Sequence, residues 1–447
     1  MATAPVQASL ATGPSTAASE GKSYLLPLSI LTSLFFIWGF LTCLNDILIP
    51  HLKAAFSLSY AEAALIQFCF FGAYFLVSMP AGAVIKRLGY QRGIVIGLLI
   101  AGAGCLAFYP AAATRSYALF LTALFTLAVG ITVLQVSANP YVAILGRPET
   151  ASSRLTLTQA FNSLGTFLAP YFGSALILSV AARGADDLAK LSAADSAAYR
   201  AAEASSVQVP YLWLAATLVA IAVVMGRLKL PVIASIVAPG ESPQSGMRSS
   251  GDRESAWAYR HLVLGALGIF VYVGGEVAIG SFLVNFMAQS DIAGLSDKAA
   301  SLYLPMYWGG AMVGRFIGAY LLKVVRPGVL LAINAAIASA LVFLCMTLNG
   351  SFAMWAILSV GLFNSIMFPT IFSLAIDGLG RHTEQGSGIV CMGIVGGAIL
   401  PLVQGALADH IGLHRAFIVP ALCYVYIIYY GLKGSHHGPP AKVAVAA

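Results

Sequence analysis

Residues 25–52, LLPLSILTSLFFIWGFLTCLNDILIPHL, form an apolar run long enough to cross a lipid bilayer. About 20 apolar residues span the hydrocarbon as a helix, and the only carboxylate in this run is Asp46. On insertion scales a charged side chain at the centre of a membrane helix costs roughly 2.5–3.5 kcal/mol. Asp46 must therefore face a polar interior, carry a proton, or alternate between these states. An ion-coupled transporter requires a carboxylate of this kind.

The composition places most of the chain in a bilayer. Hydrophobic residues make up 59% of the 447 residues and charged residues only 9%, whereas soluble domains carry about 25% charged residues. Long continuous apolar runs favour helices over an outer-membrane barrel. We therefore expect an all-α membrane protein with twelve transmembrane helices, at approximately 25–52, 61–86, 92–109, 117–145, 154–180, 208–228, 259–288, 300–323, 328–348, 352–377, 385–408 and 415–432.

Other chemistries find little support in the sequence. The histidines are scattered at span ends and in the tail, and no P-loop precedes a helix, so a membrane enzyme and an ATP-driven pump are both disfavoured. The net charge of +7 reflects membrane topology, and we expect no nucleic-acid partner. The cysteines form no CxxC pair or Cys/His cluster, so we expect no disulfide, metal or cofactor: Cys43, Cys69, Cys105, Cys345, Cys391 and Cys423.

The placement of lysine and arginine predicts the orientation, because cytoplasmic loops carry the excess of basic residues. With both termini cytoplasmic, the cytoplasmic segments hold 16 of the 24 basic residues and the outer loops hold 7, while Arg315 lies within a helix. Residues 181–207 then form an outer loop, in which an Ala-rich stretch could form a short surface helix. The expected divisions are a disordered cytoplasmic tail at 1–24, six-helix bundles at 25–228 and 258–432, a cytoplasmic linker at 229–257 and a cytoplasmic tail at 433–447.

The two bundles resemble each other weakly but in register. In the first, Pro170 follows Pro140 by 30 residues, and in the second Pro401 follows Pro369 by 32 residues. Pseudo-equivalent bundles place a substrate site between them near the midplane, and rocking of the halves gives alternating access.

The loop after the second span, GAVIKRLGYQR at 82–92, resembles the cytoplasmic signature of the major facilitator superfamily. That signature is a glycine followed by an acidic-basic pair, a further glycine and basic residues. Gly89 and the arginines fit it, whereas Lys86 stands where the acid usually is. The charge relay commonly assigned to that acid is therefore in doubt here.

Six further segments carry a narrower resemblance. They are WGF at 38–40, LNDILIP at 44–50, QFCFFGAY at 67–74, ANPY at 138–141, LTQAFNSLG at 157–165 and GLFNSIMFPT at 361–370. The chain resembles the fucose–proton symporter family and, within it, the bacterial glucose/galactose transporters. The resemblance covers residues from about 25 to 432 and implies a sugar transporter with two six-helix bundles in the bacterial inner membrane.

The resemblance implies a role for two positions in proton coupling. Asp46 matches the carboxylate that takes up and releases the coupling proton. Position 135 carries glutamate in the fucose-transporting branch, whereas Gln135 stands here, as expected of the glucose/galactose branch. Because a neutral amide cannot titrate, the proton must be carried chiefly by Asp46, and fucose is in doubt as the substrate.

The polar residues within the spans also suit a sugar. Sugars are neutral polyols, and Asn and Gln side chains both donate and accept hydrogen bonds. Gln135 and Asn139 are four residues apart and Gln159 and Asn162 three apart, so each pair shares a helix face. Each amide could instead form only an interhelical hydrogen bond. The expected substrate-binding residues are Trp38, Asn45, Gln135, Asn139, Gln159, Asn162, Trp308, Arg315 and Asn364.

Glu276 and Arg315 are further charges within the predicted spans. They could form a buried ion pair, which is the usual arrangement of intramembrane charges. Alternatively, Glu276 is a second proton- or sodium-binding carboxylate that compensates for Gln135, and Arg315 matches an arginine that the family needs for transport. Trp308 precedes Arg315 by seven residues, so both are expected on the face that lines the cavity.

These features predict a secondary active transporter that imports glucose or galactose by symport with a proton. The expected partners are a hexose, the coupling proton and the lipid bilayer, and one chain is expected to work as a monomer. Sodium coupling remains open, because a lone carboxylate serves either ion. A carrier of another small polar solute and a sugar uniporter also remain open, although Asp46 argues against the uniporter.

Overall fold

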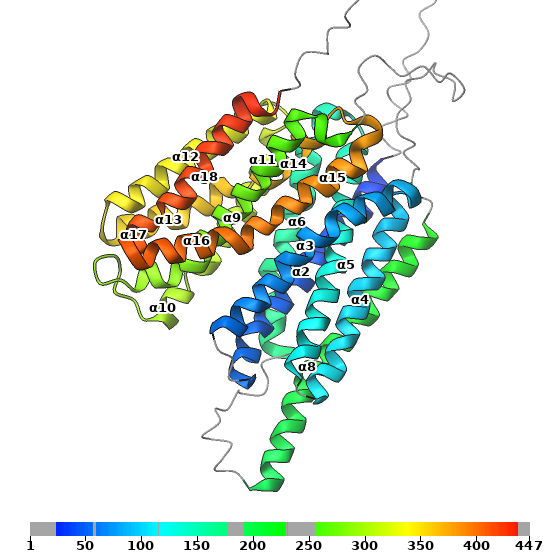
Figure 1. Ribbon diagram of the computed structural model, residues 1–447, viewed down its shortest axis with the longest axis vertical. Helices are drawn as coiled ribbons and strands as arrows, with labels where there is room; N and C mark the ends of the chain where they lie inside the picture. The colour runs from blue at the N-terminus through cyan, green and yellow to red at the C-terminus, as the bar shows by residue number, and fades with distance from the viewer. Residues whose placement is uncertain are drawn as a thin grey trace, which may run out of the picture.

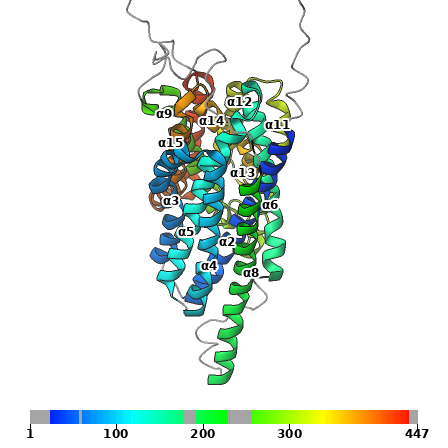
Figure 2. The same ribbon diagram turned by 90° about the vertical axis from the view of Figure 1, so that its right-hand side faces the viewer.

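The computed structural model describes residues 24–56, 60–114, 116–176, 192–228, 230 and 255–436. Almost all of the predicted tails and the linker lie outside these ranges. Figures 1 and 2 show a bundle of long helices in which α2 begins and α18 ends at the same end of the molecule. We call this end the terminal face.

Six long helices pack into an N-terminal half. The most extensive contacts within it join α4 to α5, α2 to α6, α4 to α8 and α3 to α5. The helices are α2 (Leu25–Phe56), α3 (Tyr60–Leu88), α4 (Tyr90–Thr114), α5 (Tyr117–Ile144), α6 (Ala151–Leu176) and α8 (Ala193–Arg227).

The C-terminal half has the same number of crossings, several of which are broken into shorter helices (Figure 1). The uninterrupted ones are α9 (Arg260–Ala288), α11 (Leu304–Leu321) and α12 (Pro327–Thr347). The broken ones are α13 (Gly350–Asn364) with α14 (Met367–Ile376), α15 (Thr383–Met392) with α16 (Gly396–Ile411), and α17 (Leu413–Ala416) with α18 (Ile418–Tyr429). A short helix, α10 (Asp297–Ser301), precedes α11.

Ten segments of the described chain are long and apolar enough to cross a membrane. The remaining two predicted spans correspond to α6 and α11, which lie in the same bundles but carry polar groups such as Gln159, Asn162 and Arg315. A helix surrounded by protein tolerates polar side chains that lipid would not. The architecture is thus the all-helical, twelve-crossing arrangement expected from the sequence.

One expected loop differs from the structure. Residues 193–207 lie in α8, which continues without interruption to Arg227, so this stretch is no separate surface helix. Ser192 caps the start of α8, and its hydroxyl accepts a hydrogen bond from the Asp195 amide at 3.1 Å. The Ala-rich composition favours helix over loop, because alanine has the highest helix propensity. Residues 181–191 lie outside the described structure.

Close packing of α2 against α6 depends on glycine. A methyl group on Gly39 would overlap the backbone carbonyl of Asn162, and one on Gly165 would overlap the carbonyl of Phe36. Small residues at helix interfaces let two backbones approach closely within a membrane. The contact brings the Asn162 side chain to α2, where its amide nitrogen donates to the Phe35 carbonyl at 2.9 Å.

The two halves meet near the terminal face along a set of serine contacts that we call the serine seam. Ser152 Oγ lies 2.7 Å from Ser373 Oγ, the Ser153 hydroxyl donates to the Ala319 carbonyl at 2.6 Å, and the Ser387 hydroxyl donates to the Val136 carbonyl at 3.0 Å. In each contact one partner belongs to α5 or α6 and the other to α11, α14 or α15. Neutral hydrogen bonds therefore join the halves here.

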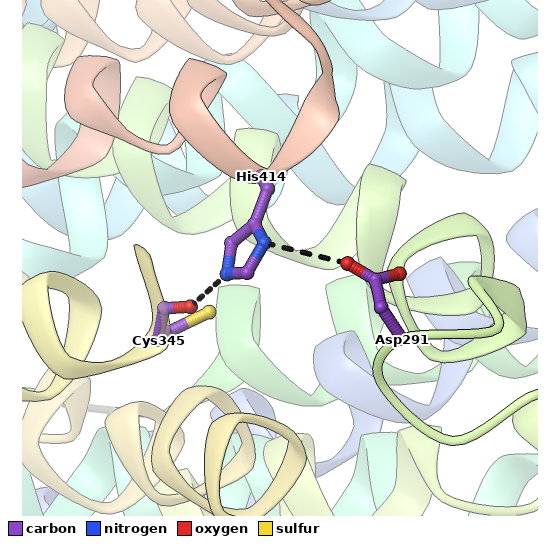
Figure 3. A network of polar contacts seen from close by, with 3 residues as sticks. All are labelled: Asp291, Cys345 and His414. Atoms are coloured by element: carbon purple, nitrogen blue, oxygen red, sulfur yellow. Dashed lines mark hydrogen bonds and ion pairs between the residues drawn. The ribbon is translucent and has the colours of Figure 1, made fainter. Parts of the chain in front are cut away.

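At the opposite end, the C-terminal half is tied together by His414. Its Nδ1 lies 3.9 Å from Asp291 Oδ2, and its Nε2 donates to the carbonyl of Cys345 at 2.5 Å (Figure 3). The backbone carbonyl of Asp291 also accepts from the Gly350 amide at 2.8 Å. These contacts join the segment after α9, the end of α12 and the start of α17. At this end, these contacts therefore join elements of the C-terminal half to one another.

The glycine contact between α2 and α6 predicts a stability effect. Gly39→Ala should lower the thermal unfolding midpoint of the purified protein in detergent, because overpacking a tight contact costs about 1–3 kcal/mol. Gly72→Ala is the matched control, since a methyl group there meets no atom within 4 Å. Equal midpoints for the two variants would contradict the close α2–α6 packing.

Candidate functional site

A cavity of about 280 Å³ lies between the two halves, on the side of the serine seam away from the terminal face. Small-molecule sites span roughly 300–1,000 Å³, so this volume suits a small solute. The N-terminal half contributes mainly neutral polar and aromatic groups, and the C-terminal half contributes both charges. The polar and tryptophan side chains among the lining residues are Trp38, Thr42, Tyr74, Gln135, Gln159, Asn162, Thr166, Tyr272, Glu276 and Arg315.

A chain of amides orients one wall of the cavity. Gln159 Nε2 donates to Asn139 Oδ1 at 3.4 Å, and Asn139 Nδ2 donates to Gln135 Oε1 at 3.1 Å. Gln135 Nε2 in turn donates to the Tyr74 hydroxyl at 3.0 Å. Three helices, α3, α5 and α6, are joined in this way. Because each amide is fixed by its neighbour, the wall presents hydrogen-bonding groups in set directions.

The second wall is formed by α2 and the facing part of α6. Trp38 is mostly buried and packs on Phe35 with ring centroids 5.2 Å apart, while part of its side chain lines the cavity. The Thr42 hydroxyl donates to the Trp38 carbonyl at 3.0 Å. Asn162 lies between this wall and the amide chain, held by the Phe35 carbonyl. An aromatic surface thus adjoins the polar groups.

The C-terminal half places both of its intramembrane charges at the cavity. Arg315 Nε donates to the Ser365 carbonyl at 3.1 Å, and Arg315 Nη1 donates to the Ser163 hydroxyl of the opposite half. Glu276 also lines the cavity. Among the described side chains, Glu276 and Arg315 do not form a salt bridge with each other. The two charges are nevertheless close enough to interact electrostatically across the cavity wall.

Three of the predicted site residues lie outside the cavity lining. Asn139 and Asn364 are fully buried. Asn139 hydrogen-bonds to the cavity residues Gln135 and Gln159 without lining the cavity itself. Asn364 Nδ2 donates to the Tyr307 hydroxyl at 2.8 Å. Trp308 is 41% exposed and packs its ring against Tyr307, with centroids 5.0 Å apart. Trp308 shares a face with Arg315, as expected, but seven residues advance a helix by about 10.5 Å, which takes the indole beyond the cavity.

Asn45 and Asp46 lie in α2, but their side chains are outside the described structure. Their predicted contacts with substrate and proton remain predictions. The structure adds three polar groups that sequence reasoning missed, namely Tyr74, Thr166 and Ser163. Tyr74 and Ser163 lie in segments that carry the family resemblance, and Thr166 follows Asn162 by four residues, so each had a signal in the sequence.

Two bundles of six crossings around a central polar cavity are the architecture of a large transporter family. The profile of the Major Facilitator Superfamily matches residues 30–393. The chain belongs to this superfamily. It is accordingly a multi-pass membrane transporter and not an enzyme.

Named relatives lie within the same superfamily. The chain is 56% identical over 420 residues to a glucose/galactose transporter of Brucella abortus, covering 94% of this chain and 97% of the relative. It is 37% identical over 412 residues to the L-fucose-proton symporter of Escherichia coli, covering 92% and 93%. The crystal structure of the superfamily transporter FucP in its outward conformation superposes with a TM-score of 0.82 at 36% identity, covering 92% of this chain and 98% of FucP.

The amide chain generates a prediction about the cavity wall. Asn139→Ala should lower the thermal unfolding midpoint of the protein, because it removes the interhelical hydrogen bond to Gln159, worth on average about 0.6 kcal/mol, and the hydrogen bond to Gln135 within α5. Asn334→Ala serves as the control, since the Asn334 amide bonds only to Leu330 within its own helix at 2.9 Å. If the two variants unfold at the same temperature, Asn139 does not hold the wall together.

Proposed function

We propose that the protein imports glucose, galactose or both by symport with a proton. The observation that carries the proposal is the cavity between the halves, where neutral amides adjoin an aromatic surface. Amide groups both donate and accept hydrogen bonds, as a neutral polyol requires. The names of the relatives, glucose/galactose transporter and L-fucose-proton symporter, support a sugar as the class of substrate.

The sugar is held chiefly by α6 and α2. The amide nitrogens of Gln159 and Asn162 already donate to protein oxygens, at 3.4 and 2.9 Å, so their side-chain oxygens remain as acceptors for sugar hydroxyls. Trp38 offers an apolar surface to the C–H face of the ring, and Arg315 donates from the opposite half. Because one chain supplies both walls, we propose that the monomer is the functional unit.

The coupling ion is carried on intramembrane carboxylates. Gln135 lines the cavity but cannot titrate, so Asp46 takes up the proton. Glu276 lines the cavity from the other half without a salt bridge to Arg315, and is a second candidate for a coupling carboxylate. Sodium could occupy the same carboxylates, and transport measurements with and without sodium separate the two ions.

The positive-inside bias assigns the terminal face to the cytoplasm of a bacterial inner membrane. The serine seam then closes the cytoplasmic side, and the cavity receives sugar from outside. Protonation of Asp46 removes a charge that would be costly in the closing, drier cavity. Bound sugar draws the walls together, the seam opens, and sugar and proton leave to the cytoplasm. The empty carrier then returns to the outward state.

Asp46→Asn tests the coupling step. The variant should lose accumulation of glucose against a gradient, because an amide cannot release a proton, while exchange of labelled for unlabelled sugar across the membrane continues. Both are measured as radiolabelled uptake into proteoliposomes, one with an imposed proton gradient and one as counterflow. Uphill accumulation by Asp46→Asn would show that Asp46 is not the coupling site.

Substitutions within and outside the cavity test the sugar contacts. Gln159→Ala should weaken glucose binding about tenfold or more, since a lost hydrogen bond is worth about 0.5–1.5 kcal/mol and its partner group is left unsatisfied. Trp308→Phe should leave the dissociation constant within about twofold, since Trp308 lies outside the cavity lining. Equilibrium dialysis of labelled glucose against purified protein measures both. The reverse ranking would place the sugar elsewhere.

A further inference from the structure

Arg315 joins the two halves at the cavity. Its Nε donates to the Ser365 carbonyl within the C-terminal half at 3.1 Å, which fixes the plane of the guanidinium. Its Nη1 donates to the Ser163 hydroxyl on α6, which belongs to the N-terminal half. The same guanidinium lines the cavity. One side chain therefore contacts both halves and the space where the substrate is proposed to bind.

The Ser163 hydroxyl is oriented to accept from Arg315. Its own hydrogen is donated to the Gln159 carbonyl at 3.0 Å, one turn earlier on α6. Ser163 is 7% exposed, so water has little access to replace either contact. A hydroxyl that donates in one direction presents its lone pairs in others. Ser163 thus provides a fixed acceptor for the cation, adjacent in sequence to the cavity residue Asn162.

This contact differs from the three hydrogen bonds of the serine seam. The three contacts of the serine seam are between neutral groups. The contact between Arg315 and Ser163 is charge-assisted, and charge-assisted hydrogen bonds are about twice as strong as neutral ones. It is also the one that borders the central cavity. Separation of the halves at this level would leave a poorly hydrated guanidinium N–H without its acceptor, which is unfavourable.

We propose that Ser163 is a positioning residue that biases the empty transporter toward the state with a closed seam. Through its hydrogen bond to Arg315 it holds the halves together until a sugar hydroxyl in the cavity offers the guanidinium a replacement acceptor. The sugar-dependent part of this proposal rests on the proposed function. The bias of the empty protein does not, because it follows from the contact between Arg315 and Ser163 alone.

Alkylation of a reporter cysteine tests the bias. Ala319 lies in the serine seam, where its carbonyl accepts from Ser153, and it is buried in this closed state, so Ala319→Cys reports the opening of the seam. In this background, Ser163→Ala should raise the rate of maleimide labelling from the terminal face about tenfold without sugar, because the acceptor is lost. Ser163→Thr keeps the hydroxyl and should label at the parent rate. Protein without Ala319→Cys gives the background from native cysteines.

Comparing Ser163→Thr with Ser163→Val separates the effect of the hydroxyl from that of side-chain size. Thr and Val have nearly the same shape, so Ser163→Val should label rapidly and Ser163→Thr slowly if the hydroxyl matters. Equal sugar-free labelling of parent, Ser163→Ala and Ser163→Val would overturn the proposal. Glucose should accelerate labelling of the parent and add little to Ser163→Ala. Absence of any glucose effect or glucose binding in the parent would reject the proposed substrate, while the sugar-free comparison still decides the role of Ser163.

Discussion

The exclusion of water from the bilayer core is the constraint on which this structure depends. Each buried polar group must find its hydrogen-bond partner within the protein. Gln159, Asn139, Gln135 and Tyr74 satisfy one another in a chain across three helices. Polar groups that bind a substrate are therefore stable in the bilayer core only where neighbouring side chains satisfy their hydrogen bonds. The polar wall of the cavity lies where α3, α5 and α6 are joined by this chain of hydrogen bonds.

The division of chemistry between the halves follows from the same constraint. The N-terminal half contributes amides that hydrogen-bond among themselves, whereas the C-terminal half contributes Glu276 and Arg315. Arg315 satisfies part of its hydrogen-bonding capacity across the gap, on Ser163. A carrier that alternates between two states needs contacts of this kind, because a contact between the halves forms in one state and breaks in the other.

Part of the cavity lining could be predicted from the sequence, because helix periodicity determines which residues share a face. The spacing of Gln159 and Asn162 places both at the cavity. Periodicity gives the direction of a side chain but not its depth relative to another helix, which is why Trp308 was expected at the cavity. The contact between Ser163 and Arg315 could not be predicted, since it depends on how α6 crosses α11. The resemblance over the whole chain indicated the fold. The early start of α8 at Ala193 follows instead from the local alanine content, which favours helix.

The central claim is that this chain couples sugar movement to an ion gradient. The most direct measurement is uptake of radiolabelled glucose into proteoliposomes that contain the purified protein, with an imposed proton gradient and with sodium present or absent. We expect glucose to accumulate above its external concentration, driven by protons and independent of sodium. Uptake that only equilibrates glucose across the membrane under every gradient would contradict it.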